Sequence, residues 1–167
     1  MKFIKKCLQF FKRNPSVNYI DDEIDEHNIE DQFQLLENAY KQLHQQSPLE
    51  NLTTHSLIDV HGNYAVEGHN PWDKSSKYTG ALSIEKSEQK YSFDWAVGIS
   101  NLYQKGEGQI ISNYLKVDFV YKDNEHTFKG LVIYKQIDEE SMAGFWIEEG
   151  IFDVGFERLT LKNKGFQ

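Results

Sequence analysis

The stretch K-Y-S-F-D-W-A-V-G at residues 90–98 decides the fold of this 167-residue chain. Its large side chains, Tyr91, Phe93, Trp95 and Val97, alternate with small or polar ones. Because successive residues of a β-strand point to opposite faces, the stretch predicts a strand with one bulky face and one small face. A face of that kind fills a core, lines a cavity or stacks on a ligand.

The same alternation recurs along the chain after Leu57. We predict eight strands, at residues 58–68, 77–86, 90–100, 108–112, 114–122, 127–137, 142–148 and 152–162. Turn signals separate them, including Asn70-Pro71-Trp72-Asp73 and Gln104-Lys105-Gly106. Consecutive strands joined by short turns pair as antiparallel neighbours, and closing such a sheet removes its edges. We therefore predict a mainly β fold: an eight-stranded antiparallel up-and-down β-barrel preceded by N-terminal helices.

The bulky set of each strand is expected to face the barrel interior, with Asp94 outside. Inward tyrosines and tryptophans combine ring area with a hydrogen-bond donor, which suits a ligand site. The predicted ligand-binding residues are Tyr64, Tyr78, Trp95, Tyr121, Tyr134 and Trp146, with Trp72 in the longest inter-strand loop as a cover over the barrel mouth. A solid aromatic core without a cavity is the alternative.

Several strand motifs resemble those of small bacterial β-barrels with avidin-like or lipocalin-like (calycin-like) architecture. Among them are G-N-Y-A-V-E-G-H-N-P at 62–71, Y-T-G-A-L-S-I at 78–84, F-D-W-A-V-G at 93–98 and M-A-G-F-W-I-E-E-G at 142–150. The resemblance covers about residues 57–162 and implies the barrel and, by analogy of fold, a ligand-binding role. The polar biotin contacts of avidin are not matched residue by residue, so biotin is not implied.

The chain opens with a basic, amphipathic segment, M-K-F-I-K-K-C-L-Q-F-F-K-R, which predicts a helix over residues 1–14. Lys5 and Lys6 interrupt the apolar core that a secretory signal needs. One interpretation is an interfacial helix on the anionic inner face of a membrane; the other is a helix packed on its own domain or on a partner. The predicted membrane-binding residues are Lys2, Phe3, Lys5, Lys6, Phe10, Phe11, Lys12 and Arg13. Either way we expect a cytoplasmic protein, and the single cysteine excludes an internal disulfide.

An acidic linker and a second helix follow, in residues 15–56. Apolar residues recur at helical spacing, which predicts a helix from Ile29 to about Gln46: Ile29, Phe33, Leu36, Tyr40 and Leu43. This stripe either packs on the following domain or joins two copies of the chain into an oligomer through residues 29–43. Ser47-Pro48-Leu49-Glu50 predicts a short further helix over residues 48–54. The domains are thus the basic helix at 1–14, the acidic linker and helix at 15–56, and the barrel at 57–167.

The net charge of −8 argues against nucleic acid as a partner. Residues 54–61 contain serine, histidine and aspartate, but a catalytic triad is defined by its geometry in space and not by closeness in sequence, so we expect no catalytic residues. His55, His61 and His69 lack the spacing of a zinc site, so we expect no metal and no cofactor. Glu148-Glu149 is interpreted as a solvated turn, and Gly106-Glu107-Gly108 as a hairpin turn. Two function classes remain ahead of an enzyme. One is a barrel that binds a small apolar or aromatic ligand; the other is a protein-interaction module, such as an inhibitor, immunity or accessory protein, with a solid core.

Overall fold

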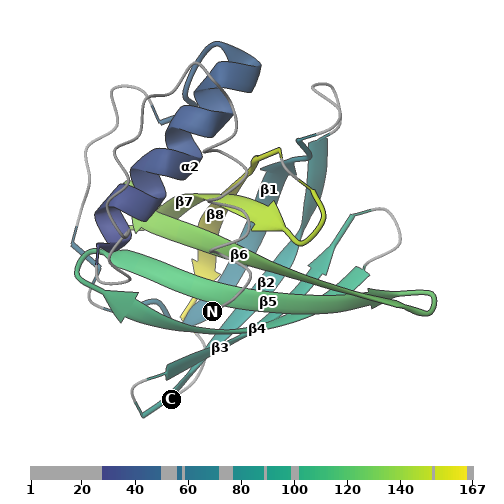
Figure 1. Cartoon of the computed structure of the whole chain (residues 1–167). Coiled ribbons are helices and arrows are strands. Elements are labelled where there is room, and N and C mark those ends of the chain that lie inside the picture. Colours follow the sequence, from purple (N-terminus) through teal and green to yellow (C-terminus); the bar gives the residue numbers. More distant parts are fainter. Residues whose placement is uncertain are drawn as a thin grey trace.

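The structure, a computed structural model, describes residues 28–49, 56–57, 59–71, 77–88, 90–98, 102–151 and 153–164. Eight strands form one closed antiparallel barrel in which each strand pairs with the next and the last pairs with the first (Figure 1). The strands are β1 (Gly62–His69), β2 (Lys77–Ser87), β3 (Lys90–Val97), β4 (Leu102–Ile111), β5 (Tyr114–Asp123), β6 (His126–Gln136), β7 (Ser141–Glu148) and β8 (Gly155–Asn163). The predicted up-and-down barrel is confirmed.

The predicted alternation of side chains is also confirmed. Tyr91, Phe93, Trp95 and Val97 of β3 are all buried and belong to a hydrophobic cluster inside the barrel. Asp94, between them, lies on the outer face, where its carboxylate is 3.3 Å from the Lys105 ammonium. The opening stretch therefore builds a wall of the barrel interior.

The prediction for β4 was wrong. A turn was expected at residues 104–106 and a strand only at 108–112, but β4 runs from Leu102 to Ile111 and pairs with both β3 and β5 along its length. The reason lies in the neighbouring strand. A β-carbon on Gly106 would lie 2.9 Å from the Trp95 ring, so this glycine leaves room for a ring and does not turn the chain. Ser112 and Asn113 form the actual turn into β5.

The segment before β1 was predicted as the start of a strand from residue 58, but β1 begins at Gly62. Leu57 and Val60 are instead buried in the interior cluster. The Val60 carbonyl accepts a hydrogen bond of 3.0 Å from the Tyr64 hydroxyl, which fixes this segment to the strand that follows. These residues close one end of the barrel with apolar side chains.

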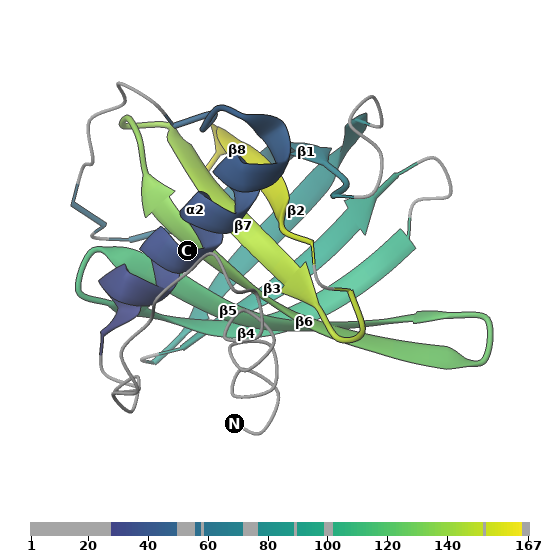
Figure 2. The ribbon, with the colours of Figure 1, turned by 45° about the horizontal axis from the view of Figure 1, so that its top comes forward.

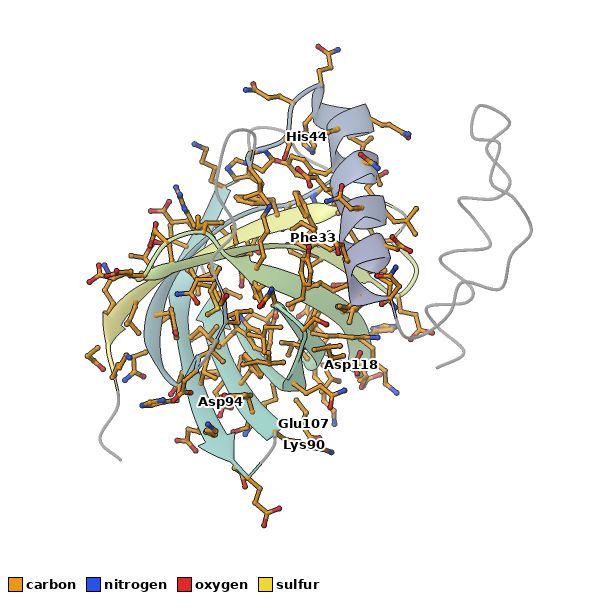
Figure 3. All side chains as sticks on the ribbon, turned by 90° about the vertical axis from the view of Figure 1, so that its left-hand side faces the viewer. Phe33, His44, Lys90, Asp94, Glu107 and Asp118 are labelled. Carbon is orange, nitrogen blue, oxygen red and sulfur yellow. The ribbon has the colours of Figure 1, made fainter. Side chains whose placement is uncertain are left out.

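The helix α2 (Ile29–His44) lies against the outside of the barrel, over β5 to β8 (Figures 1 and 2). Asn28 caps it by accepting a hydrogen bond from the Asp31 backbone N–H. Phe33 is fully buried on the helix side that faces the barrel (Figure 3), and its ring contacts those of Tyr114 and Phe145 at centroid distances of 5.1 and 5.5 Å. The apolar stripe thus packs on the barrel, so it is not free to join a second copy of the chain.

In the described part of the chain α2 is the only helix, where the sequence predicted several. The basic helix of residues 1–14 lies outside the described residues. Of the predicted helix at 48–54, Pro48 and Leu49 form a turn and the rest also lies outside. Ser47 nevertheless accepts a hydrogen bond of 3.1 Å from the Leu49 backbone N–H. Within the described ranges, no helix combines the length and the apolar character needed to cross a bilayer.

Candidate functional site: an aromatic cavity with two carboxyl groups

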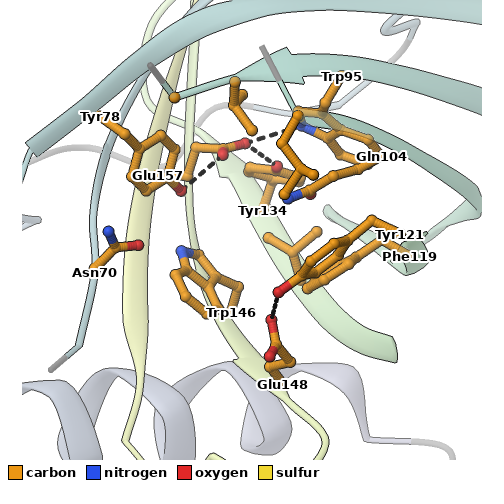
Figure 4. A pocket seen from close by; sticks show the side chains of 14 residues that line it. Asn70, Tyr78, Trp95, Gln104, Phe119, Tyr121, Tyr134, Trp146, Glu148 and Glu157 are labelled. Atoms are coloured by element: carbon orange, nitrogen blue, oxygen red, sulfur yellow. Dashed lines mark hydrogen bonds between the residues drawn. The ribbon is translucent and has the colours of Figure 1, made fainter. Parts of the chain in front are cut away.

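The barrel interior contains a cavity of about 230 Å³ near the end where β1 and β3 finish (Figure 4). Larger hollows among the described residues lie on the outer wall beside β3 to β6 and at the opposite end of the barrel, next to Val60 and Tyr64. The cavity is lined by aromatic and aliphatic side chains with a few polar groups among them: Asn70, Tyr78, Trp95, Val97, Gly98, Leu102, Gln104, Phe119, Tyr121, Val132, Tyr134, Trp146, Glu148 and Glu157. An apolar pocket with a small number of placed polar groups is the usual form of a small-molecule site.

Five of the seven residues predicted as ligand contacts line this cavity: Tyr78, Trp95, Tyr121, Tyr134 and Trp146. Tyr64 does not. It lies toward the closed end and donates to the Val60 carbonyl, and burial, with Asp59 and Tyr91 nearby, raises the pKa of its hydroxyl to about 12. Trp72 lies outside the described residues.

The aromatic walls depend on glycines in the neighbouring strands. Gly68 of β1 pairs with Tyr78 of β2, and a β-carbon on Gly68 would lie 2.0 Å from the Cζ atom of the Tyr78 ring. Gly155 of β8 pairs in the same way with Trp146 of β7, and its β-carbon would lie 2.1 Å from the indole. Each ring lies across the space that the missing side chain leaves. The glycines therefore determine where the rings stand around the cavity.

Glu157 is the central polar group of the cavity. One carboxyl oxygen, Oε2, accepts a hydrogen bond of 3.0 Å from the Tyr78 hydroxyl. The other, Oε1, accepts from the Trp95 indole N–H at 3.2 Å and from the Tyr134 hydroxyl at 2.5 Å. Burial raises the pKa of the Glu157 carboxyl, while the three hydrogen bonds act against that rise by favouring the charged form. Three donors directed at one carboxyl group are the partners that an ionised carboxylate needs.

Glu148 supplies a second carboxyl group to the same cavity. The interpretation as a solvated turn acid was wrong for this residue, which is only 3% exposed; its neighbour Glu149 is exposed as expected. Its Oε2 accepts a hydrogen bond of 2.7 Å from the Tyr121 hydroxyl. Burial raises the pKa of the Glu148 carboxyl, and the bond from Tyr121 acts in the opposite direction.

Besides Asn70 and Glu148, two polar residues of the cavity wall, Gln104 and Glu157, were missed for separate reasons. Gln104 was assigned to a turn, so its side chain was given no direction. Glu157 lies in the predicted strand at 152–162, on the same face as Leu159 and Leu161. Leu159 belongs to the interior cluster and Leu161 packs against it. Applying the alternation to F-E-R-L-T-L-K would have placed Glu157 inside, because residues two apart share a face of the strand.

The polar residues at the start of the barrel serve a local structural purpose. The His61 ring Nδ1 lies 2.7 Å from the Asp59 carboxylate, which also accepts from the His61 backbone N–H and the Tyr91 hydroxyl. This arrangement holds the irregular segment that leads into β1. Across the described ranges, histidine, cysteine and acidic side chains do not gather in threes in a way that could hold a metal ion.

The sequence matches no family model, and the curated proteins compared with it include no significant relative. Among solved structures, the chain resembles a redesigned β-barrel, mFAP1, bound to DFHBI, with a TM-score of 0.51 and 10% sequence identity. The similarity covers 60% of this chain and 93% of the other. At this identity the likeness concerns the fold alone. The fold is a closed eight-stranded antiparallel β-barrel.

The raised pKa of Glu157 predicts a pH dependence of stability. A carboxyl whose pKa is higher in the folded than in the unfolded state contributes stability that is complete below the unfolded pKa, about 4.3, and is lost as pH rises through the folded pKa. Residue 157 cannot titrate in Glu157→Gln, so the free energy of unfolding of the wild type should fall relative to this variant as the pH rises above about 4.3. Urea unfolding at several pH values measures the difference in the free energy of unfolding. The contribution of Glu148 to the pH dependence cancels in this difference because both proteins contain that residue. A difference that stays constant, or changes in favour of the wild type, would contradict the assignment.

Proposed function

We propose that this barrel is a non-enzymatic binding protein that holds one small, mainly apolar or aromatic molecule in its interior. The observation that supports this most is the cavity itself: the interior is lined by rings but is not filled by them. The sequence was also compatible with a solid aromatic core that has no cavity. A core of that kind would favour a protein-interaction module. The wall of the cavity has five aromatic side chains that carry a hydroxyl or an indole N–H group, and two carboxyl groups. A cavity of this kind favours the binding of a small molecule.

The volume limits the size of the ligand. An apolar cavity of about 150 Å³ is enough to hold benzene. A cavity of about 230 Å³ therefore suits a molecule of one or two rings, or an aliphatic chain of similar bulk. The fold neighbour mFAP1, which was solved bound to DFHBI, supports the idea that a barrel of this shape can hold a small molecule.

The two ends of the barrel give the ligand a direction of entry. Leu57 and Val60 fill one end, whereas Asn70, Gly98 and Leu102 border the cavity at the other. Gly98 is held there by a hydrogen bond of 3.0 Å from its backbone N–H to the Thr79 carbonyl. The proposed entrance is thus between Asn70, which follows β1, and Gly98 and Leu102, at the adjoining ends of β3 and β4.

A thermal-shift screen of small aromatic and aliphatic compounds, with tryptophan fluorescence as a second readout, tests this function. A bound ligand stabilises the fold by mass action, by about 2.7 kcal/mol at one hundred times its dissociation constant. We expect hits that also change the tryptophan emission, and Trp95→Phe should weaken both responses because Trp95 lines the cavity. Tyr64→Phe, toward the closed end, is the matched control and should leave the responses unchanged.

Two results would count against this proposal. One is a broad screen in which no compound raises the melting temperature. The other is a set of hits that are insensitive to Trp95→Phe, because their binding would then lie elsewhere. In either case the protein-interaction module becomes the leading function, with the charged outer face of β3 and β4 as its first candidate surface (Figure 3).

Attachment to a membrane is a separate part of the proposal and rests on the sequence of residues 1–14 alone. Each basic residue close to an anionic surface contributes about 1 kcal/mol, and the apolar face adds to that. The full chain should therefore co-sediment with anionic liposomes, and less so at high salt. Deletion of residues 1–14 should remove the binding. Equal sedimentation of the two proteins would show that the segment is not a membrane anchor.

A further inference from the structure

In the part of the chain that the structure describes, the charged residues on the cavity wall are all acidic. Among the described residues that line it there are two glutamates and no lysine, arginine or histidine. The partners of Glu157 are Tyr78, Trp95 and Tyr134, and the partner of Glu148 is Tyr121, all of them neutral donors. The ion pairs found in the described ranges include neither glutamate. A carboxylate taken out of water without a positive partner is costly for the fold, so a cation in this cavity would relieve a cost already present.

The two carboxyl groups differ in how much hydrogen-bonding capacity they leave for a ligand. An ionised carboxylate accepts about four hydrogen bonds. Glu157 already accepts three, so it offers mainly its charge. Glu148 accepts one, from Tyr121, and keeps most of its acceptor capacity. A ligand with several N–H donors would therefore hydrogen-bond mainly to Glu148.

The rings of the cavity favour the same kind of ligand. Trp146, Tyr121 and Phe119 line the same cavity as the two carboxyl groups, and Figure 4 draws these side chains around it. Aromatic faces attract cations within about 6 Å of the ring centroid, and tryptophan does so most strongly. Carboxylates and ring faces together form a cation site that also accommodates an apolar body.

We propose that the ligand of this cavity is an organic cation, an ammonium or amidinium group on a small aromatic or aliphatic body, hydrogen-bonded to Glu148 and offset in charge by Glu148 and Glu157. This rests on the proposed function, because it names the chemical class of the molecule that the cavity binds. An anion of the same size would be repelled by both carboxylates in a medium of low dielectric constant. A neutral molecule would leave the two negative charges as they are.

A charge series on one ring tests the inference with the full chain. The probes are 2-phenylethylammonium, the neutral 2-phenylethanol and the anionic phenylacetate, measured by calorimetry at pH 7.5. We expect the ammonium to bind at least about tenfold more tightly than the alcohol, since hydrogen bonds between charged partners exceed neutral ones by that order. Phenylacetate should bind more weakly than the alcohol.

Charge variants then assign the effect to the cavity. Glu148→Gln should weaken the ammonium about tenfold and change the alcohol by less than about threefold. Glu107→Gln makes the same substitution on the outer face of the barrel, where the side chain is 78% exposed, and should change neither. Glu157→Gln should act in the same direction as Glu148→Gln, which guards against a fault in the folding of one variant. Thermal melts without ligand show whether each variant is folded.

The pH dependence gives an independent readout. The ammonium remains protonated well above neutrality, so only the carboxyl groups titrate as the pH is lowered. The groups that face them are Tyr78, Tyr134 and Trp95 at Glu157 and Tyr121 at Glu148, and none of these carries a positive charge. Affinity for the ammonium should therefore fall as the pH drops and the carboxyl groups take up protons, while affinity for the alcohol should not.

The outcomes separate the two proposals. If the alcohol or phenylacetate binds as tightly as the ammonium, and Trp95→Phe weakens that binding, the cavity is a binding site but the cation is wrong. If the ammonium is preferred but Glu148→Gln and Glu157→Gln leave its affinity unchanged, the inference is also overturned. If none of the three probes binds at millimolar concentration, the cation inference fails, and the proposed function then depends on the broader thermal-shift screen.

Discussion

Replacing Phe33 by alanine should lower the free energy of unfolding by about 3–5 kcal/mol, the usual cost of removing a buried phenylalanine ring. The ring is fully buried between α2 and the barrel, contacts Tyr114 and Phe145, and has the Lys135 ammonium 5.3 Å from its centroid. Because α2 packs on the barrel through this one stripe, the void would lie in the middle of the contact. Urea unfolding followed by fluorescence measures the loss.

The matched control for this prediction is Tyr103→Ala. Tyr103 is also aromatic but is 75% exposed on β4, so its removal should cost less than about 0.5 kcal/mol. A loss of less than about 1 kcal/mol for Phe33→Ala would mean that α2 is only loosely attached to the barrel. The stripe of α2 would then again be available for contact with a second copy of the chain.

Replacing Gly68 by alanine should destabilise the barrel by about 1–3 kcal/mol, although it adds a single methyl group, because overpacking costs about that much. The new β-carbon would lie 2.0 Å from the Tyr78 ring and 2.3 Å from its hydroxyl oxygen. The ring has to move, and its hydrogen bond to Glu157 is lost. We therefore expect both a lower stability in urea and a loss of ligand response in the thermal-shift assay.

A double-mutant cycle tests whether this cost arises from the ring. In the background Tyr78→Leu the space opposite residue 68 is larger, so Gly68→Ala should cost much less there than in the wild type. Equal costs in the two backgrounds would show that the glycine is required by the backbone and not by Tyr78. The claim that the glycines position the cavity rings would then be wrong at this pair.

The sequence predicted the barrel and the helix because both repeat a simple period over many residues. Alternation in β3 and in β5 gave the inner face directly, and the 4-3-4-3 spacing from Ile29 gave the buried side of α2. Glycine was the residue most easily misinterpreted. Gly106 and Gly108 signalled a turn when considered alone, but in the barrel they lie beside Trp95 and Phe93 of the neighbouring strand. The register of strand pairing determines which residues are neighbours across strands, and a short stretch of sequence does not reveal that register.

The aromatic half of the site was predictable, and the acidic half was not. Tyr78, Trp95, Tyr121, Tyr134 and Trp146 follow from alternation, since each is a large residue on an inner face. Glu148 ends a strand beside a turn, where a glutamate is usually solvated, so its burial depends on how β7 meets the rest of the barrel. Glu157 could be assigned inward by period, but its three donors come from β2, β3 and β6, which only the closed barrel brings together.

The measurement that tests the binding cavity most directly is a ¹H–¹⁵N NMR titration of the full chain with 2-phenylethylammonium and, in parallel, 2-phenylethanol. The Trp95 indole N–H, which donates to Glu157, is a reporter inside the cavity, and the backbone signals of Gly98 and Leu102 report on its entrance. We predict that at least one of the two probes shifts these signals together, saturably, while Tyr64 and Val60 at the closed end remain unchanged. Shifts confined to the closed end or to the outer face, with the signals of Trp95, Gly98 and Leu102 unchanged, would contradict a binding site inside this barrel. The absence of any shift with either probe at millimolar concentration would overturn the cation inference.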